Sequence, residues 1–304
     1  MDISVVIPAY NREATIERAV MSILKQTILP TEIIVVDDCS TDSTAAIVQK
    51  LRRENSLVKL IRLKKNQGAQ VARNCGVKIA KGNWIAFLDS DDEWLENKLE
   101  IQQKAVEENP EFDVFYGDYY IKKNDRIHYR YCKMKGRDGN YFESILFGSL
   151  VLFQGMLIRK KALEDIGLMD KNVPSYQEWD TNIRLSEKHK YYYINKPLFI
   201  YNLHKGETIS KDQNKKIIGF QYVFVKNCNL FLEDNIIDRS ISFYYKGMYL
   251  RYKESGSWKS LYYFCFEKLF IHFLKINMLK PLCKFVIKKR WQNLNFRLFH
   301  NKRE

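Results

Sequence analysis

The chain has 304 residues, of which 46% are hydrophobic and 28% are charged, and its formal net charge is +14. This composition provides for a large apolar core and excludes a disordered or fibrous chain. No run of about 18 uncharged apolar residues occurs, so we expect no membrane-spanning helix. The first residues lead directly into an apolar segment, so we also expect no signal peptide. The six cysteines are scattered and form no Cys-x-x-Cys pair, which favours reduced thiols in a cytoplasmic protein.

Strand-like and helical segments alternate through the first 90 residues. The predicted strands are residues 3–7, 32–36, 57–63 and 84–88, and the predicted helices are residues 13–26, 42–54 and 68–80. Ser40 and Thr41 provide an N-cap setting for the second helix, and Gly82 is a stop signal after the third. This order predicts an α/β fold with a doubly wound, mostly parallel sheet.

Polar residues follow three of these strands. Pro8 to Asn11 follow the first, Asp37 and Asp38 the second, and Asp89 to Asp92 the fourth. Ligands bind outside the carboxyl ends of the strands in such sheets. Three carboxylates within four residues are costly unless a cation offsets their repulsion. Because Mg²⁺ and Mn²⁺ prefer carboxylate oxygens, the sequence predicts a metal–phosphate site at this edge.

The pattern becomes weaker after Asp92. We expect helices at 94–108 and 160–166, strands at 112–120, 150–158 and 191–194, and a further helix that opens at residues 176–180. Residues 121–140 are polar, basic and rich in tyrosine, which indicates a flexible segment or a hairpin. From about residue 215 the pattern is helical to the end of the chain.

Four motifs in the first half resemble those of the family 2 glycosyltransferases, which are inverting enzymes of the GT-A fold. They are Ser4–Asn11 (SVVIPAYN), Ile33–Asp42 (IIVVDDCSTD), Asn66–Gly76 (NQGAQVARNCG) and Leu88–Asp92 (LDSDD). Each motif alone is weak, but four in this order are specific. The resemblance covers about residues 1–210. It implies a GT-A catalytic domain over 1–214, with a nucleotide-binding half at 1–112 and an acceptor half at 113–214, and a helical, basic C-terminal region at 215–304.

The resemblance implies a uridine site in the segments that follow the first two strands. Pro8, Ala9 and Tyr10 are expected to hold the uracil and ribose, with Tyr10 stacked beside the base. The alternative is that Tyr10 only caps the sheet. Asp38 is expected to accept a hydrogen bond from uracil. It would also serve as a carboxylate at the N-terminus of helix 42–54, and both roles are compatible.

The resemblance also implies residues for the pyrophosphate and the metal. Gly68 is expected to let the backbone approach the phosphates, and Arg73 to reach them, unless Arg73 is an ordinary surface arginine. Asp89 is expected to lie near the donor ribose and the metal, and Ser90 is expected to belong to the same donor-binding site. The implied ligands of a Mn²⁺ or Mg²⁺ ion are Asp89, Asp91, Asp92 and His204. Asp92 has an alternative role as the cap of the following helix, and His204 has a structural alternative.

Glu178 is the candidate general base of the transfer. An inverting reaction needs one carboxylate to accept the proton of the attacking acceptor hydroxyl. The family usually has Glu-Asp, or an Asp alone, before an aromatic residue and a second Asp. This chain has Gln177 and Glu178 before Trp179 and Asp180, so Asp180 is the rival candidate. The alternative for both carboxylates is a stabilising charge at a helix N-terminus.

The last 64 residues carry much of the positive charge. From residue 241 onward there are 14 Lys or Arg and three Glu, a surplus of 11. Helix 259–275 has a broad apolar side, and Lys284, Lys288, Lys289 and Arg290 follow it, with Trp291 beside them. Such segments bind anionic membrane surfaces, so we expect a peripheral protein on the cytoplasmic face of the membrane. The alternative is a helical subdomain packed on the catalytic core or on a second subunit.

The resemblance implies transfer of a sugar from a UDP-sugar to a glycan or lipid-linked acceptor, in the synthesis of a cell-surface polysaccharide, such as a capsule, or of a glycolipid. A processive synthase would need membrane spans. A nucleic-acid-binding protein would not explain the acidic strand ends, because carboxylates repel phosphates unless a metal is present, so we expect no nucleic acid. A nucleotidyltransferase would need a glycine-rich loop after the first strand. A protein that binds nucleotide-sugars without transferring them remains an alternative.

Overall fold

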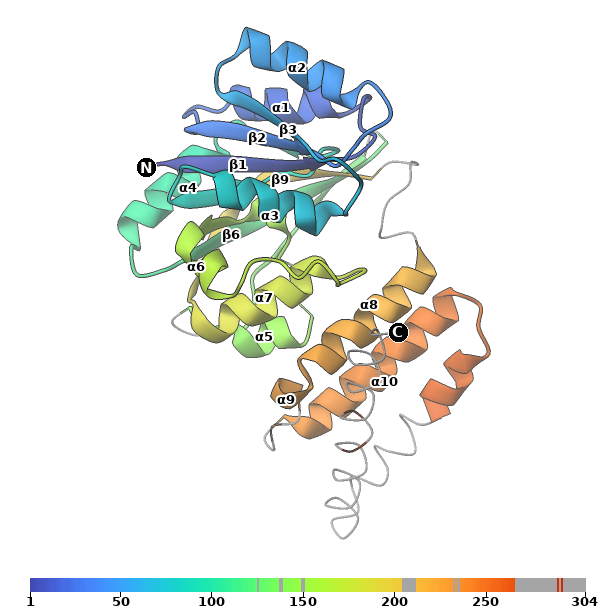
Figure 1. Cartoon of the computed structure of the whole chain (residues 1–304). Coiled ribbons are helices and arrows are strands. Elements are labelled where there is room, and N and C mark those ends of the chain that lie inside the picture. The colour runs from blue at the N-terminus through green and yellow to red at the C-terminus, as the bar shows by residue number, and fades with distance from the viewer. Residues whose placement is uncertain are drawn as a thin grey trace. The chain divides into compact units, whose positions relative to one another are not determined.

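The computed structural model describes residues 1–124, 126–136, 139–148, 151–203, 212–231, 233, 236–265, 289 and 291. The chain forms two compact units. Unit 1 consists of Met1–Lys171 and Thr181–Lys205, and unit 2 consists of Asn172–Asp180 and Gly206–Glu304. Figure 1 labels their helices and strands. The segment Asn172–Asp180 is therefore separated in sequence from the rest of unit 2.

One sheet forms the centre of unit 1. Its strands follow the order β3-β2-β1-β4-β8-β6-β9-β5, and β7 pairs with β6. The strands are β1 (Ile3–Ala9), β2 (Glu32–Asp37), β3 (Val58–Arg62), β4 (Trp84–Phe87), β5 (Glu93–Trp94), β6 (Val114–Lys123), β7 (Arg126–Arg130), β8 (Leu157–Arg159) and β9 (Tyr191–Leu203). Strands β1 to β4 are parallel, as predicted. The second half is mixed, because β8 is antiparallel to both β4 and β6 while β6 and β9 are parallel.

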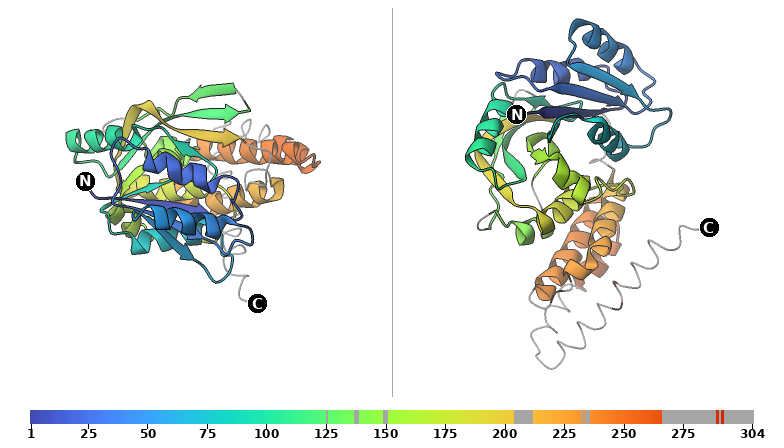
Figure 2. Two further views of the ribbon diagram at one scale, coloured as in Figure 1. Left: turned by 90° about the horizontal axis from the view of Figure 1, so that it is seen from above. Right: turned by 60° about the vertical axis from the view of Figure 1, so that its left-hand side comes forward.

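Helices cover both faces of the parallel strands. Helices α1 (Ile16–Leu24) and α2 (Thr44–Glu54) lie on one face and α3 (Ala69–Ile79) on the other (Figures 1 and 2). Helix α1 confirms a helix within the predicted range 13–26, and it buries Ile16, Val20 and Ile23, which lie on one helical face. Helix α3 approaches β1 so closely that a β-carbon at Gly76 would lie 2.4 Å from a methyl carbon of Val6. The doubly wound arrangement is therefore tightly packed.

Two local signals act differently from the prediction. The N-cap of α2 is Ser43 rather than Ser40 or Thr41, and the neighbouring Asp42 carboxylate accepts from the Thr44 amide at 2.9 Å. Gly82 follows α3, but what requires a glycine there is close packing, since a β-carbon would lie 2.6 Å from the Ser4 nitrogen.

Several boundaries in the second half also differ. Helix α4 is Lys98–Glu108 rather than 94–108, because Glu93 and Trp94 pair with β9 as the short strand β5. The predicted strand 150–158 is divided into the 3₁₀ helix η1 (Phe153–Gly155) and β8. Helices α5 (Phe142–Leu146) and α6 (Lys160–Asp165) are short, and the latter confirms the predicted helix 160–166. Strand β9 has 13 residues, because it continues along β6 far beyond the predicted 191–194.

Unit 2 is helical in its described part. Its helices are α8 (Gln213–Lys226), α9 (Cys228–Phe231) and α10 (Ile237–Glu254), and residues 259–265 are also helical. Its core is a cluster of aromatic rings contributed by Trp179, Phe220, Phe224, Phe231, Phe243, Tyr244 and Trp291. None of the described helices is long and apolar enough to span a membrane. The rest of the predicted helix 259–275, with Lys284, Lys288 and Arg290, lies outside the described residues.

The described cysteines, Cys39, Cys75, Cys132, Cys228 and Cys265, are all free thiols. This agrees with the expectation of reduced cysteines for these five residues.

Candidate active site

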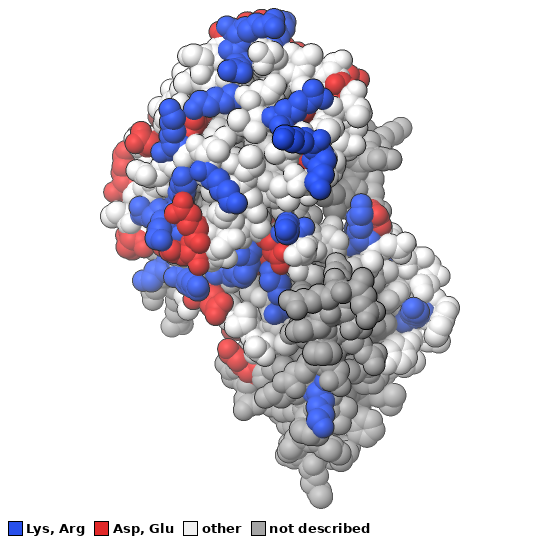
Figure 3. Space-filling model, viewed as in Figure 1, with Lys and Arg blue, Asp and Glu red and all other residues white. Residues whose placement is uncertain are grey.

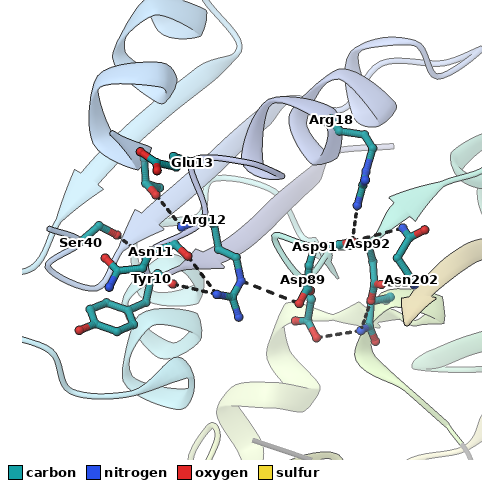
Figure 4. Close-up of polar contacts among 12 residues, drawn as sticks. Tyr10, Asn11, Arg12, Glu13, Arg18, Ser40, Asp89, Asp91, Asp92 and Asn202 are labelled. Atoms are coloured by element: carbon teal, nitrogen blue, oxygen red, sulfur yellow. Dashed lines mark hydrogen bonds and ion pairs between the residues drawn. The ribbon is translucent and has the colours of Figure 1, made fainter. Parts of the chain in front are cut away.

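Three carboxylates meet immediately after β4. Asp89, Asp91 and Asp92 each place one oxygen within 4.8 Å of the oxygens of the other two. Figure 4 shows them beside the loop that follows β1 and beside Asn202 of β9. Ser90, between them, is buried. This cluster lies where the sequence predicts a metal–phosphate site, and its carboxylate oxygens are of the kind that a hard divalent cation prefers.

Asp92 is the innermost of the three. It is 1% exposed, and its carboxylate accepts hydrogen bonds from the backbone amide of Asn202 and from Gln154 Nε2, both at 2.8 Å. Burial raises its pKa well above the ordinary value, and the neighbouring charges of Asp89 and Asp91 raise it further. A bound cation would reverse both effects. Asp92 does not cap the next helix, because α4 begins after Asn97.

Asp89 accepts from two buried side chains. Arg73 donates to one oxygen at 2.5 Å, and Gln154 Nε2 donates to the other at 2.8 Å. Arg73 is only 5% exposed, and its guanidinium carbon lies 5.0 Å from the centre of the Phe153 ring. The alternative that Arg73 is an ordinary surface arginine is therefore wrong. Arg73 forms an ion pair with Asp89 and therefore holds this carboxylate in place.

Two further arginines approach Asp91. Arg12 Nε lies 3.8 Å from its carboxylate, and the same guanidinium donates to the Tyr10 and Asn11 carbonyls. Arg18 donates to the Asp91 carbonyl at 2.7 Å and pairs with Glu93. Arg12 therefore links the loop after β1 to the carboxylate cluster (Figure 4).

Sequence reasoning missed four residues of this site, which are Arg12, Arg18, Gln154 and Asn202. Arg12 directly follows the SVVIPAYN motif, so its positive charge could have indicated a contact with the predicted carboxylates. The other three lie outside all four motifs. Gln154 and Asn202 come from η1 and β9, and only the fold brings them to Asp92.

The loops after β1 and β2 are joined by hydrogen bonds. Asn11 has a left-handed φ of 50°, its amide donates to Ser40 Oγ at 2.9 Å, and its side-chain oxygen accepts from the Thr41 amide at 2.9 Å. Pro8 and Ala9 are buried within β1, whereas Tyr10 is 43% exposed. The ring of Tyr10 therefore remains accessible to a planar ligand, as expected for a base-stacking residue.

Asp38 organises the loop before α3. It is 2% exposed, and its two oxygens accept from the backbone amides of Gln67 at 2.8 Å and Gly68 at 2.7 Å. Gly68 has a φ of 91°, a conformation that disfavours any other residue. The structure thus joins Asp38 and Gly68 by a hydrogen bond. The family resemblance assigns Asp38 to the uracil and Gly68 to the phosphates of the donor. At the N-terminus of α2, the Asp42 carboxylate accepts from the Thr44 amide at 2.9 Å.

The candidate base Glu178 lies in the first turn of α7 (Gln177–Lys188), within unit 2. Tyr176, which precedes this turn, has a left-handed φ of 64°, and its hydroxyl accepts from Arg251 Nε at 2.9 Å. The Arg251 guanidinium carbon lies 3.9 Å from the centre of the Phe220 ring, on which Trp179 is stacked at 5.4 Å. Helices α8 and α10 therefore fix the turn that carries Glu178.

Asp180 differs from Glu178 in its surroundings. Asp180 is 1% exposed and lies 2.8 Å from Lys226 Nζ, whereas Glu178 is of intermediate exposure. A buried, paired carboxylate is poorly suited to take a proton from an incoming hydroxyl. His204 lies outside the described residues.

Comparison with known proteins identifies similar sequences. Residues 4–167, more than half of the chain, match the family model of Glycosyl transferase family 2. One relative is the Escherichia coli protein UDP-Glc:alpha-D-GlcNAc-diphosphoundecaprenol beta-1,3-glucosyltransferase WfgD, to which the chain is 42% identical over 125 residues. The aligned residues make up 41% of this chain and 48% of WfgD. It is 28% identical over 236 residues to an uncharacterized glycosyltransferase of Haemophilus influenzae, 73% of this chain and 75% of that protein. The chain spans about half the length of WfgD and of the E. coli relative WfaP.

The fold resembles a solved structure as well. The crystal structure of S. aureus TarS 1-349 in complex with UDP-GlcNAc superposes with a TM-score of 0.63 and 23% identity, over 83% of this chain and 72% of that chain. This likeness confirms the predicted GT-A type of α/β fold.

Proposed function

Since this chain belongs to glycosyltransferase family 2, we propose that it transfers a sugar from a UDP-sugar to a hydroxyl group of a lipid-linked glycan, with inversion at the anomeric carbon. The observation that carries the proposal is the cluster of Asp89, Asp91 and Asp92 beside the loop that presents Tyr10. Carboxylates that gather a divalent cation next to an accessible aromatic ring suit a nucleoside diphosphate donor.

The donor is proposed to be a uridine nucleotide. WfgD is named for UDP-Glc, and TarS structures contain UDP-GlcNAc and UDP. In this chain the uridine would contact Pro8, Ala9 and Tyr10, with Asp38 beside them. Gly68, Arg73, Asp89 and Ser90 complete the proposed donor site. Arg73 acts mainly through Asp89, because its guanidinium is buried on that carboxylate.

The metal proposed for this site is Mn²⁺ or Mg²⁺, held by Asp89, Asp91 and Asp92, with His204 as a further candidate ligand. The described donor set fits, since it consists of hard oxygens and the raised pKa of Asp92 arises from burial and from the neighbouring charges of Asp89 and Asp91. When bound, the ion would neutralise charge on the departing nucleoside diphosphate.

Glu178 is proposed as the general base. It accepts the proton of the acceptor hydroxyl while that oxygen bonds to the anomeric carbon from the face opposite the leaving group. The bond between that carbon and the UDP oxygen breaks, and the electron pair leaves with UDP. Asp180 is a weaker candidate for the base because it is buried and paired with Lys226.

The acceptor is proposed to be a lipid-linked glycan of cell-surface polysaccharide or glycolipid synthesis, extended by one sugar in each reaction. WfgD is named for a diphosphoundecaprenol acceptor, and a Bacillus subtilis relative, TuaG, is described as a putative teichuronic acid biosynthesis glycosyltransferase. Such an acceptor requires access to a membrane. The basic C-terminal region is proposed to provide peripheral contact with anionic lipid on the cytoplasmic face, and self-association through this region is the alternative.

A screen of UDP-sugars tests the proposal. The full chain is incubated with each UDP-sugar in Mn²⁺ or in EDTA, and released UDP is measured with and without an N-acetylglucosamine diphosphate lipid. We expect slow hydrolysis of one donor in Mn²⁺, none in EDTA, and faster UDP release with an acceptor. Donor binding without any UDP release would instead indicate a nucleotide-sugar-binding protein.

A further inference from the structure

The β6–β7 hairpin presents four basic side chains on one face. The strand register pairs Lys123 with Arg126, Ile121 with His128, and Tyr119 with Arg130. Successive residues of a strand point to opposite faces, so Lys123, Arg126, His128 and Arg130 share one face. All four are exposed. We call this set the basic hairpin face.

The same face of the sheet leads to the carboxylate cluster. Tyr119, the partner of Arg130, stacks on Phe199 with ring centres 4.8 Å apart. Phe199 lies under η1, since a β-carbon at Gly155 would be 3.0 Å from its ring. Burial raises the pKa of Tyr119, and the nearby charges of Arg130 and Asp92 act on it in opposite directions. Tyr119 therefore connects Arg130, its partner in the hairpin, to Phe199 of β9, the strand that also carries Asn202.

The hairpin is anchored on its opposite face. Asp118 is fully buried, and its carboxylate accepts from Tyr129 Oη at 2.7 Å, Tyr193 Oη at 2.9 Å and the Cys132 amide at 2.6 Å. These bonds tie β7 and the segment after it to the centre of the sheet. Figure 2 shows the hairpin, in green, beside β9 at the border of the sheet. The basic side chains are thus carried on a fixed support.

The basic hairpin face differs from the ion-paired lysines on the helices of unit 1. On the face in Figure 3, acidic side chains lie among the basic ones. Among the described residues, Lys123, Arg126 and Arg130 take part in none of the ion pairs, whereas Lys50, Lys104 and Lys161 each pair with a carboxylate one turn away. A cluster of basic side chains beside a proposed transferase site is complementary to an anionic substrate.

We propose that the basic hairpin face binds the diphosphate group of the lipid-linked acceptor and thereby directs the acceptor hydroxyl toward the donor. This inference rests on the proposed function and adds the acceptor's recognition group to it. Arg126 and Arg130 offer planar forks that match phosphate oxygens, and Lys123 adds a third charge.

The test uses a soluble short-chain isoprenyl diphosphate as the probe, with the corresponding neutral alcohol for comparison. Binding to the full chain is measured in EDTA, which removes metal-mediated binding at the carboxylate cluster. We expect the diphosphate to bind and the alcohol to bind much more weakly. The triple variant K123Q/R126Q/R130Q should weaken diphosphate binding by about tenfold, since each exposed ion pair contributes modestly.

The matched control is R52Q/R53Q on α2, which removes two exposed arginines elsewhere and should leave binding unchanged. Equal binding by the triple variant and the unaltered chain would overturn the inference. Vesicles of phosphatidylglycerol distinguish a membrane surface from the acceptor. If the triple variant loses vesicle binding but keeps diphosphate binding, the face contacts the bilayer and the inference is wrong. UDP-sugar hydrolysis in Mn²⁺ is recorded separately, so that a failure of the proposed function is recognised independently.

Discussion

The carboxylate cluster and the Glu178 turn are held by different kinds of interaction. Asp89, Asp91 and Asp92 are held in unit 1 by polar groups from Arg73, Gln154 and Asn202. The turn at Tyr176–Asp180 is held in unit 2 by stacked aromatic rings, by Arg251 and by the pair of Asp180 with Lys226. Hydrogen bonds and ion pairs hold the first region, and aromatic packing is the main interaction in the second. We call the aromatic rings and Arg251 around the Glu178 turn the packed support.

This difference has a physical consequence. Like charges at the carboxylate cluster make its free energy depend on cations and pH, because a bound ion or a proton relieves their repulsion. Aromatic packing around Trp179 responds to neither. We therefore expect metal and pH to act on donor binding, and mutations in unit 2 to act on the transfer step.

The largest expected effect is that of Asp91→Ala. This substitution removes one of the three clustered proposed ligands and should abolish metal-dependent UDP binding, with a loss of about 100-fold or more in affinity. Isothermal titration of UDP in Mn²⁺ and in EDTA measures it. Unaltered Mn²⁺-dependent affinity would show that the cluster is not a metal site.

Glu178→Gln should come next. A loss of general base catalysis lowers kcat for transfer by about 10²- to 10⁴-fold, while the affinity for UDP stays unchanged. The comparison is Asp180→Asn, which leaves Lys226 without its charge partner and should lower the Tm more than Glu178→Gln does. If Asp180→Asn instead removes turnover at an unchanged Tm, the base is Asp180.

Arg251→Ala tests whether the packed support matters for catalysis. It removes the bond to Tyr176 and the contact with Phe220, so we expect kcat to fall by about tenfold with UDP affinity unchanged. Lys246→Ala, an exposed position on the same helix, is the matched control. Arg251→Lys should restore part of the loss, since a lysine keeps the charge. An equal fall in kcat for both Ala variants would mean that α10 is generally sensitive.

The smallest effect concerns pH. The pKa of Asp92 is raised by burial and by Asp89 and Asp91, so protons compete with the metal at higher pH than at an ordinary carboxyl group of pKa 3.8. Metal affinity should therefore fall as pH decreases through this raised range. The slope should be shallower in Asp92→Asn, measured by Mn²⁺ titration between pH 5 and pH 8. Parallel slopes would assign the titration to another group.

The sequence predicted the first half of unit 1 well because each signal there is local. Polar residues follow the predicted apolar strands, at Asn11, Asp38 and Asp89, and parallel strands place such ends together. Gln154 and Asn202 could not be predicted, since η1 and β9 reach Asp92 only through sheet pairing across 62 and 110 positions. The contacts that hold the Glu178 turn could not be predicted either, because Arg251 lies 75 positions from Tyr176 in the sequence.

The contact of Gly76 with Val6 bears on how this protein can be engineered. Replacing a helical glycine by alanine ordinarily raises stability by limiting the freedom of the unfolded chain. At Gly76 the added methyl group would meet β1 at 2.4 Å, so α3 would have to move away from the sheet. Arg73 is carried by the same helix one turn earlier. A consensus or thermostabilising redesign that treats all helical glycines alike would therefore displace the arginine that steadies Asp89.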